Sequence, residues 1–223
     1  ILNNSVKIFI TGINGFIGSN LASYLSSINH NIYGSVSEDW KLYNKHKLVK
    51  KLFVIKLNKP FDETIFNEMD VIIHCAYDYS KHSTATNING TISISKAANS
   101  NKTKQIFVSS YSAHNNNETD YGKVKYSLED YFLKKGHIII RPGLVVGSGG
   151  LFVRIYKIMQ KYPIVPLLDG GKGLVPILCI KDLEVCISKI INKYNAGTFN
   201  LFNKNYITLH KFAHELRDKA KFN

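Results

Sequence analysis

The sequence is poor in cysteine, in arginine and in long apolar runs, and each shortage excludes a class of protein. Its three cysteines, Cys75, Cys179 and Cys186, are too few and too irregularly spaced for a disulfide framework or a metal site. We expect buried thiols in a reducing compartment. No apolar stretch approaches the roughly 20 residues that cross a bilayer. The sequence therefore predicts a cytoplasmic protein with no metal site and no membrane partner.

Acidic residues are also scarce: 16 Asp and Glu stand against 29 Lys and Arg, for a formal net charge of +13. Such a charge is a common footprint of nucleic-acid binding. The basic residues are nearly all lysines, however, and the densest group, at 41–51, falls where a solvated helix face is expected. A lysine-rich composition explains the charge as well, so we expect no nucleic-acid partner. A basic surface would equally attract an anionic diphosphate substrate.

Short apolar runs alternate with amphipathic stretches from residue 6 to residue 146. We expect strands at residues 6–10, 31–36, 52–57, 71–75, 105–109 and 138–146. We expect helices between them at 16–25, 88–98 and 121–134. Continuously apolar strands between helices indicate a parallel sheet that is covered on both faces, which is the doubly wound α/β (Rossmann) architecture.

After residue 147, glycine and proline interrupt this pattern. A helix is expected at 182–192, a strand at 198–201 and a last amphipathic helix at 208–221. We therefore divide the chain into a dinucleotide-binding core and a small C-terminal substrate lobe. The core comprises residues 1–147 with 177–203, and the lobe comprises 148–176 with 204–223.

Three glycines, Gly12, Gly15 and Gly18, stand three apart where the first strand meets the first helix. Gly12 lets the chain turn sharply, Gly15 lets a pyrophosphate approach the backbone, and Gly18 lets the helix pack closely on the strand. The helix N-terminus adds free N–H groups and the positive end of its dipole. This context predicts a turn that binds the phosphates of a dinucleotide.

The adenine end of this site is less well marked. An acidic residue that binds the adenosine ribose is expected about 20 residues further on. That place holds Val36 or Ser37, and Glu38 and Asp39 follow one or two residues late. No arginine lies nearby in the sequence to bind a 2′-phosphate; only Ser37 and Lys41 could help. NAD and NADP therefore both stay open as the cofactor.

Tyr121 and Lys125 stand four residues apart at the start of a predicted helix, so their side chains share a face. An ammonium beside a phenol favours the phenolate, which lowers the pKa of the tyrosine and suits it to proton transfer. Ser110, just after the fifth strand, could hydrogen-bond the reacting oxygen beside Tyr121. A Tyr-x-x-x-Lys pair often arises by chance on a helix surface, but its place after a dinucleotide turn makes it far more specific.

Together these segments resemble the extended short-chain dehydrogenase/reductase family, in its nucleotide-sugar epimerase/dehydratase branch. The resemblance runs through most of the chain. It is carried by ThrGlyIleAsnGlyPheIleGly at 11–18, AspValIleIleHisCysAla at 70–76, AsnIleAsnGlyThr at 87–91, ValSerSer at 108–110, TyrGlyLysValLys at 121–125 and ArgProGlyLeuValValGly at 141–147. IleLysAspLeu at 180–183 and GlyThrPheAsnLeu at 197–201 also have counterparts. These motifs are specific to the family and not to a substrate.

The resemblance implies an NAD(P)-dependent epimerase or 4-keto-reductase that acts on a nucleotide-diphosphate sugar. It implies that Tyr121 is the acid/base, that Lys125 positions the cofactor and the phenol, and that Ser110 polarises the sugar oxygen. It also implies a homodimer formed through the helices at 88–98 and 121–134. The residues implied to contact the cofactor are Gly12, Asn14, Gly15, Phe16, Ile17, Gly18, Ser37, Leu57, Cys75, Ala76, Tyr77, Tyr121, Lys125 and Pro142.

The sequence also departs from the family pattern. Lys-Leu-Asn at 56–58 stands where an acid near adenine is often found, and Tyr-Ser at 111–112 replaces the Asp-Glu pair of dehydratases. Dehydration is therefore less expected than epimerisation or keto reduction. Few residues follow Asn200, so the substrate lobe is either small or incomplete. The alternative is a catalytically silent NAD(P)-binding sensor or scaffold, which the intact serine, tyrosine and lysine oppose.

Overall fold

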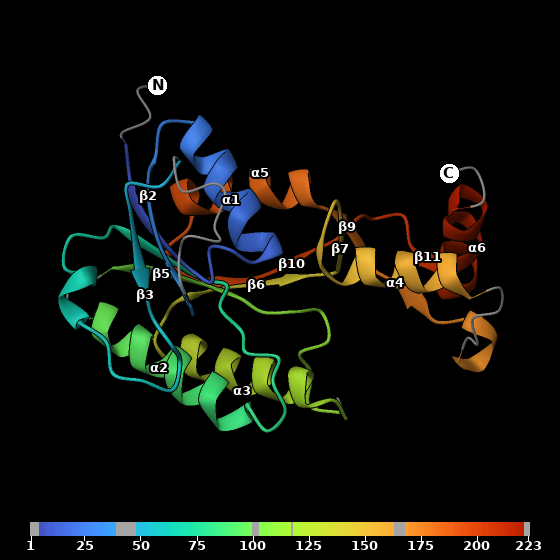
Figure 1. Ribbon diagram of the computed structural model, residues 1–223, viewed down its shortest axis with the longest axis horizontal. Coiled ribbons are helices and arrows are strands. Elements are labelled where there is room, and N and C mark those ends of the chain that lie inside the picture. Colours follow the sequence, from blue (N-terminus) through green and yellow to red (C-terminus); the bar gives the residue numbers. More distant parts are fainter. Residues whose placement is uncertain (1–4, 39–47, 100–102, 117, 163–167, 221–223) are drawn as a thin grey trace.

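The computed structural model describes residues 5–38, 48–99, 103–116, 118–162 and 168–220. Its centre is a seven-stranded sheet in the order β10-β6-β5-β4-β1-β2-β3, in which every neighbouring pair of strands is parallel (Figure 1). The doubly wound parallel sheet predicted from the sequence is confirmed. The strands are β1 (Lys7–Thr11), β2 (Asn31–Val36), β3 (Lys51–Val54), β4 (Val71–His74), β5 (Lys104–Val108), β6 (Ile138–Pro142) and β10 (Gly197–Leu201).

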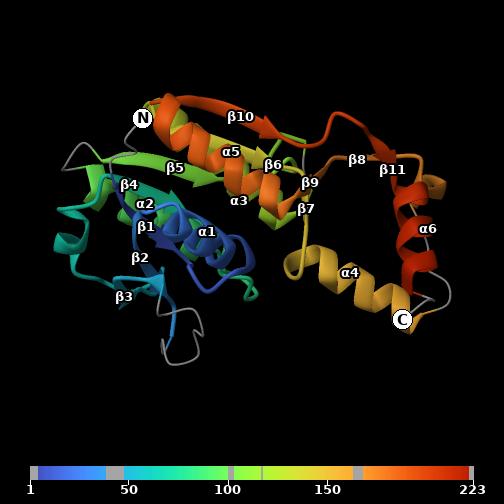
Figure 2. The same cartoon turned by 90° about the horizontal axis from the view of Figure 1, so that it is seen from above.

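Successive residues of the central strands point to opposite faces of the sheet, and both faces are buried. Ile8 and Ile10 of β1 belong to one core, while Phe9 between them belongs to another. This two-sided burial is why the strands are continuously apolar. Helices cover each face (Figures 1 and 2): on one side α1 (Phe16–Ser27) and α5 (Ile180–Lys193), and on the other α2 (Thr84–Asn99) and α3 (Asp120–Lys134).

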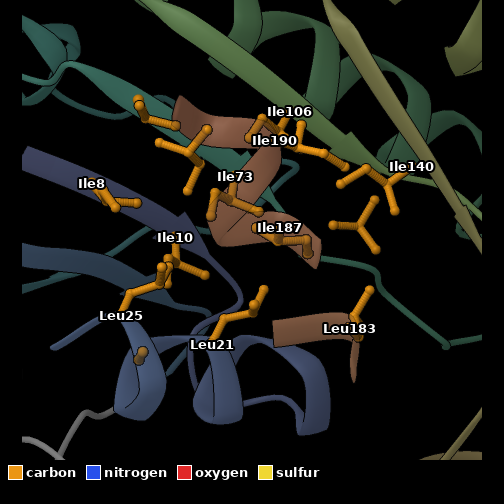
Figure 3. Packing of buried hydrophobic residues seen from close by; sticks show 14 of the residues in the cluster. Ile8, Ile10, Leu21, Leu25, Ile73, Ile106, Ile140, Leu183, Ile187 and Ile190 are labelled. Atoms are coloured by element: carbon orange, nitrogen blue, oxygen red, sulfur yellow. The ribbon is translucent and has the colours of Figure 1, made fainter. Parts of the chain in front are cut away.

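A large core lies between the sheet and helices α1 and α5 (Figure 3). Isoleucines supply most of its sheet side, because β-branched side chains fit a pleated surface. Leu21 and Leu25 of α1 and Leu183 and Ile187 of α5 reach it from the helices and are fully buried. Each such burial stabilises the fold by about 1.5–3 kcal/mol. This core therefore fixes α1, and the turn at its N-terminus, against the sheet.

The elements after β6, apart from α5 and β10, extend away from the large sheet (Figures 1 and 2). We call them the C-terminal lobe from here on; β7 and β9, which the division made from the sequence places in the core, are included because they pair with each other and not with the large sheet. The core of this lobe includes Met159, Phe212 and Leu216. The lobe adjoins the start of α1: a Cβ on Gly149 or Gly150 would lie 2.5 or 2.7 Å from the ring of Phe16. Its elements are β7 (Leu144–Val146), α4 (Gly150–Lys161), η4 (Leu168–Gly171), β8 (Leu174–Val175), β9 (Ile177–Cys179), β11 (Ile207–Thr208) and α6 (Leu209–Ala220).

Some strand predictions need correction. The single strand expected at 138–146 is two strands, β6 and β7, because the chain changes sheet at Gly143. The Gly143 N–H donates to the carbonyl of Leu201 at 3.0 Å, and the next N–H, of Leu144, donates to that of Pro176 at 2.6 Å. The third strand also starts and ends earlier than expected, at Lys51–Val54.

The surface differs from expectation at two further places. Cys179 is exposed, so the prediction of buried thiols is wrong for this residue, while Cys75 and Cys186 are half-buried and all three cysteines are free. Cys179 is the last residue of β9, which pairs with β7, and it follows the buried Leu178. Of the solvated helix expected at 41–51, residues 41–47 lie outside the described residues, and Lys51 begins β3 instead. None of the helices in the described ranges has the length and apolar character that a membrane span requires.

Candidate active site

A cleft of about 1140 Å³ opens at the carboxyl edge of the seven-stranded sheet. Its walls come from the segments that follow β1 to β6 and from the first turns of α3 and α4. The strand order reverses on either side of β1, which pairs with β4 on one side and β2 on the other. In open parallel sheets, ligands bind at such a switch point. The cleft is therefore the candidate active site.

The turn between β1 and α1 has the geometry that its glycines predict. Gly12 has φ +63°, in the left-handed region, and a Cβ there would lie 2.8 Å from the Cα of Ala76. A Cβ on Gly18 would lie 2.5 Å from the carbonyl oxygen of Gly12. Gly15 is the N-cap of α1 and supplies no capping side chain, and the first helical turn carries no acidic residue. The first N–H groups of the helix, which have no intrahelical partner, therefore offer an anion site beside the cleft.

Two charged residues lie at the end of the cleft next to β2 and β3. Glu38 lines it although it comes two residues after β2 ends at Val36, so the acid that stands late in the sequence still reaches the site. Lys56 follows β3 and lines the same end, together with Ser37 and Leu57. This end therefore presents both an acid and a cation.

Tyr121 lies in the first turn of α3, within a group of aromatic side chains at the opposite end of the cleft. Thr119 is the N-cap of α3 and accepts a hydrogen bond from the N–H of Gly122 at 3.2 Å, which fixes where the helix begins. The Tyr121 ring centroid lies 4.9 Å from that of Tyr77 and 6.3 Å from that of Tyr79, whose plane is nearly parallel. Ser110, two residues after β5, lines the same end of the cleft, where its Oγ lies 2.9 Å from Oγ of Ser112 and accepts a hydrogen bond from the Ser112 N–H at 3.2 Å. The structure therefore brings Ser110 and Tyr121 to the same cleft, and the hydrogen bond expected from Ser110 to the reacting oxygen stays a prediction.

Lys125 lies one turn further along α3 and is only 4% exposed. Its Nζ donates a hydrogen bond to the carbonyl of Val108 at 2.8 Å. The same atom lies 4.7 Å from the ring centroid of Phe107 and 5.7 Å from that of Tyr121. Burial lowers the pKa of this ammonium from 10.5 to about 8. Lys125 is thus an interior cation held against aromatic rings and one backbone carbonyl.

Burial also governs the acidity of Tyr121. It raises the pKa of the phenol, the neighbouring Tyr79 adds to the rise, and the nearby Ser110 hydroxyl opposes it. The expected lowering of this pKa by Lys125 is therefore not found. The reason is geometric, because the ammonium donates to Val108 and not to the phenol.

A comparison of the sequence with known protein families matches residues 8–203 to the NAD dependent epimerase/dehydratase family. The chain belongs to this family. The matched range contains β1, the turn, Ser110, Tyr121 and the strand that closes the sheet, β10. No curated protein matches the chain.

Solved structures share the fold of this member of the epimerase/dehydratase family. A UDP-glucose 4-epimerase from Thermotoga maritima, solved with UDP-glucose, is 17% identical with a TM-score of 0.76, over 97% of this chain and 83% of that one. An NDP-hexosamine 5,6-dehydratase of tunicamycin biosynthesis is 17% identical with a TM-score of 0.80, over 97% and 82%. A Bordetella bronchiseptica enzyme in complex with NAD is 17% identical with a TM-score of 0.76, over 98% and 79%.

Most of the site residues that the sequence predicts meet in the one cleft. Lys125 does not line it, because its side chain is directed into the protein interior. Among the lining residues that sequence reasoning missed are Tyr79 and Arg154, which belong to no motif. Their only sequence signals are the closeness of Tyr79 to the fourth strand and the rarity of arginine. The predicted residues that line the cleft are Gly12, Asn14, Gly15, Phe16, Ile17, Gly18, Ser37, Leu57, Cys75, Ala76, Tyr77, Ser110, Tyr121 and Pro142.

His74, which the sequence places at the end of an apolar strand, has no role in the cleft. It is 2% exposed, and its Nε2 lies 2.9 Å from Oε1 of the buried Gln105 on β5. Burial lowers the pKa of the imidazole to about 4, so the ring is neutral near pH 7. It is a structural histidine of the sheet.

Proposed function

We propose that this chain is an NAD-dependent enzyme that acts on a nucleotide-diphosphate sugar by hydride transfer, as an epimerase or a 4-keto-reductase. The observation that carries the proposal is that the glycine turn at 12–18, Ser110 and Tyr121 all line the same cleft. Family membership supports the cofactor class. The structural relatives named above include an epimerase and a dehydratase of nucleotide sugars, which supports the substrate class.

The residues of the cleft fit a dinucleotide. Gly12, Gly15 and Gly18 leave three places along the turn without a side chain, and Thr11 ties this turn to the segment after β4. Its Oγ1 accepts hydrogen bonds from the N–H groups of Cys75 and Ala76, each at 3.1 Å. Ser109, also in the lining, has a buried hydroxyl with no hydrogen-bond partner among the described residues, so it can bond a ligand atom. We propose that the turn binds the pyrophosphate and that Glu38 or Ser37 contacts the adenosine ribose.

The chain's own residues would handle the proton of the reacting hydroxyl. NAD, when bound, supplies the ring that accepts and returns a hydride. Tyr121 would give its proton to a keto oxygen, and the phenolate that remains would take a proton from a sugar hydroxyl in the reverse direction, while Ser110 donates a hydrogen bond to the same oxygen. The raised pKa of Tyr121 keeps the phenol protonated near neutral pH, so the tyrosine suits proton donation to a keto oxygen. Lys125 would contact the rings of Phe107 and Tyr121 and place a positive charge beside them.

Replacing Tyr121 by phenylalanine tests this function. Wild type and variant are incubated with NAD and NADP and with a panel of nucleotide sugars, and epimer or keto products are identified by mass spectrometry and NMR. We expect the variant to lose at least 100-fold in turnover, since general acid–base groups contribute about 10²–10⁴-fold. Tyr126→Phe removes an exposed phenol from the same helix and is the matched control. Equal turnover by Tyr121→Phe and wild type would rule out the assigned role.

A silent dinucleotide-binding sensor is the second candidate. The direction of the Lys125 ammonium toward Val108, and its absence from the cleft lining, favour it. A sensor would bind NAD or NADP in a calorimetric titration and yet convert no nucleotide sugar of the panel. Turnover of any one of them would exclude this candidate.

A further inference from the structure

Tyr79 is an exposed aromatic residue, 72% accessible, in the irregular segment after β4. The residue before it, Asp78, is held by the buried Asn87, whose side chain accepts from the Asp78 N–H and donates to the Asp78 carbonyl, both at 2.8 Å. The Ser83 hydroxyl donates to the same carbonyl at 2.7 Å, and the Ser80 N–H donates to the Asp78 carboxylate at 2.8 Å. Tyr79 is therefore exposed but rigidly placed, because the backbone around it is fixed.

The Tyr79 ring lies between the catalytic end of the cleft and the C-terminal lobe. It is nearly parallel to the ring of Tyr121, at 12° and 6.3 Å between centroids. The guanidinium of Arg154, from α4, lies 5.9 Å from the Tyr79 ring centroid. Tyr79 and Arg154 both line the cleft. An exposed ring and a cation thus lie side by side next to the phenol of Tyr121.

Arg154 is placed to receive an anion. Of the other charged residues that line the cleft, Glu38 and Lys56 lie at the opposite end, and the Asp78 carboxylate accepts a hydrogen bond from the Ser80 N–H. In the part of the chain that the structure describes, no carboxylate forms an ion pair with Arg154. The turn at 12–18 already offers a site for the cofactor's pyrophosphate. Arg154 therefore provides a second anion site, on the Tyr121 side.

We propose that Tyr79 and Arg154 form one subsite, in which a sugar ring packs on Tyr79 and the phosphate joined to that sugar pairs with Arg154. A phenol ring offers a rigid apolar face with a polar edge, which suits the C–H face and the hydroxyls of a sugar. A guanidinium matches a phosphate through two parallel hydrogen bonds. The proposal rests on the proposed function and names the group that the site recognises: the sugar phosphate next to the reacting hydroxyl.

Calorimetric titration of the full chain saturated with NAD tests the subsite without requiring turnover. The probes are UDP-glucose, ADP-glucose and GDP-mannose, and the corresponding nucleoside diphosphates without a sugar. We expect Arg154→Ala to weaken binding of sugar-bearing and sugar-free probes at least tenfold. We expect Tyr79→Ala to weaken only the sugar-bearing probes, and both variants to keep the wild-type affinity for NAD. Lys157→Ala removes a charge from an exposed position of the same helix and is the matched control.

Several results would overturn the subsite. One is equal weakening by Arg154→Ala and Lys157→Ala, which would show a general effect of charge. Another is loss of NAD affinity in Arg154→Ala, which would assign the arginine to the cofactor. A third is the absence of binding of every probe to the wild type. If the wild type converts a nucleotide sugar but both variants bind the probes with wild-type affinity, the proposed subsite is wrong and the proposed function is supported. If binding depends on both residues but nothing is converted, the subsite stands and hydride transfer falls.

Discussion

Lys125 carries a charge in the interior, and its replacement by methionine measures what that charge does to stability and to function. Burial lowers the pKa of the ammonium from 10.5 to about 8. At pH 7 the folded protein therefore bears a cost of about 3 kcal/mol for keeping this group charged, at about 1.4 kcal/mol per pKa unit. Methionine removes the charge and keeps the length of the chain, while the carbonyl of Val108 loses its donor at a cost of about 1 kcal/mol. The variant should be more stable than wild type by about 2 kcal/mol at pH 7.

The pH dependence follows from the same shift. Between pH 8 and 10.5 the unfolded chain holds the proton and the folded chain releases it, so the stability of the wild type rises with pH in this window. At pH 10 the remaining cost of the charge is about 1 kcal/mol, which the lost hydrogen bond of the variant offsets. The two proteins should therefore become nearly equal in stability at pH 10.

Urea unfolding at pH 7, 8.5 and 10, followed by circular dichroism, gives the free energies of unfolding. The same preparations are assayed for NAD binding and for turnover, which we expect to fall in the variant because the cation beside Tyr121 is gone. A variant that is less stable than wild type at pH 7, or a stability difference that does not change with pH, would refute the account of Lys125 as a destabilising buried charge.

Two further substitutions test the glycine turn and a buried ion pair, one at a time. In Gly18→Ala the new Cβ would lie 2.5 Å from the Gly12 carbonyl oxygen, and because overpacking costs about 1–3 kcal/mol we expect NAD affinity to fall roughly tenfold. Calorimetry with Ser23→Ala on the same helix as control checks it, and an unchanged affinity contradicts it. Arg141→Ala leaves the Glu129 carboxylate, 2% exposed, buried without its partner and should cost about 3–5 kcal/mol. Lys134→Ala breaks the exposed ion pair with Asp130 on α3, the helix that also carries Glu129, and should cost under about 0.5 kcal/mol. Urea unfolding measures both losses of stability, and equal losses would contradict the reasoning.

The parts of the fold that the sequence predicts are those set by local chemistry. The strand that contains Ile8, Phe9 and Ile10 is apolar at every position because both of its faces are buried, and a run of this kind is visible without a structure. The turn was predictable because a left-handed φ at Gly12 and the contact at Gly18 both demand glycine. That Ser110 and Tyr121 line one cleft followed from the place of each residue at the end of its strand or the start of its helix.

The parts that escaped prediction depend on residues far apart in the sequence. Lys125 was expected to act on the phenol, but its direction depends on the carbonyl of Val108, which no spacing rule includes. Tyr79 and Arg154 come together only when α4 is placed beside the loop after β4. The break at Gly143 likewise depends on Leu201 and Pro176, whose carbonyls accept hydrogen bonds from two successive N–H groups, those of Gly143 and Leu144.

The glycines at the start of the C-terminal lobe set a limit on how this scaffold can be redesigned. Side chains at 149 or 150 would occupy the place of the Phe16 ring, and Gly150 also has a φ of +69°. The ring of Phe16, in the turn proposed to bind the cofactor, thus packs against the lobe that carries Arg154. A chimera that takes its lobe from a relative must therefore bring these glycines with it or replace Phe16 at the same time. A segment exchange intended to change substrate preference should therefore begin after these two glycines, at Leu151.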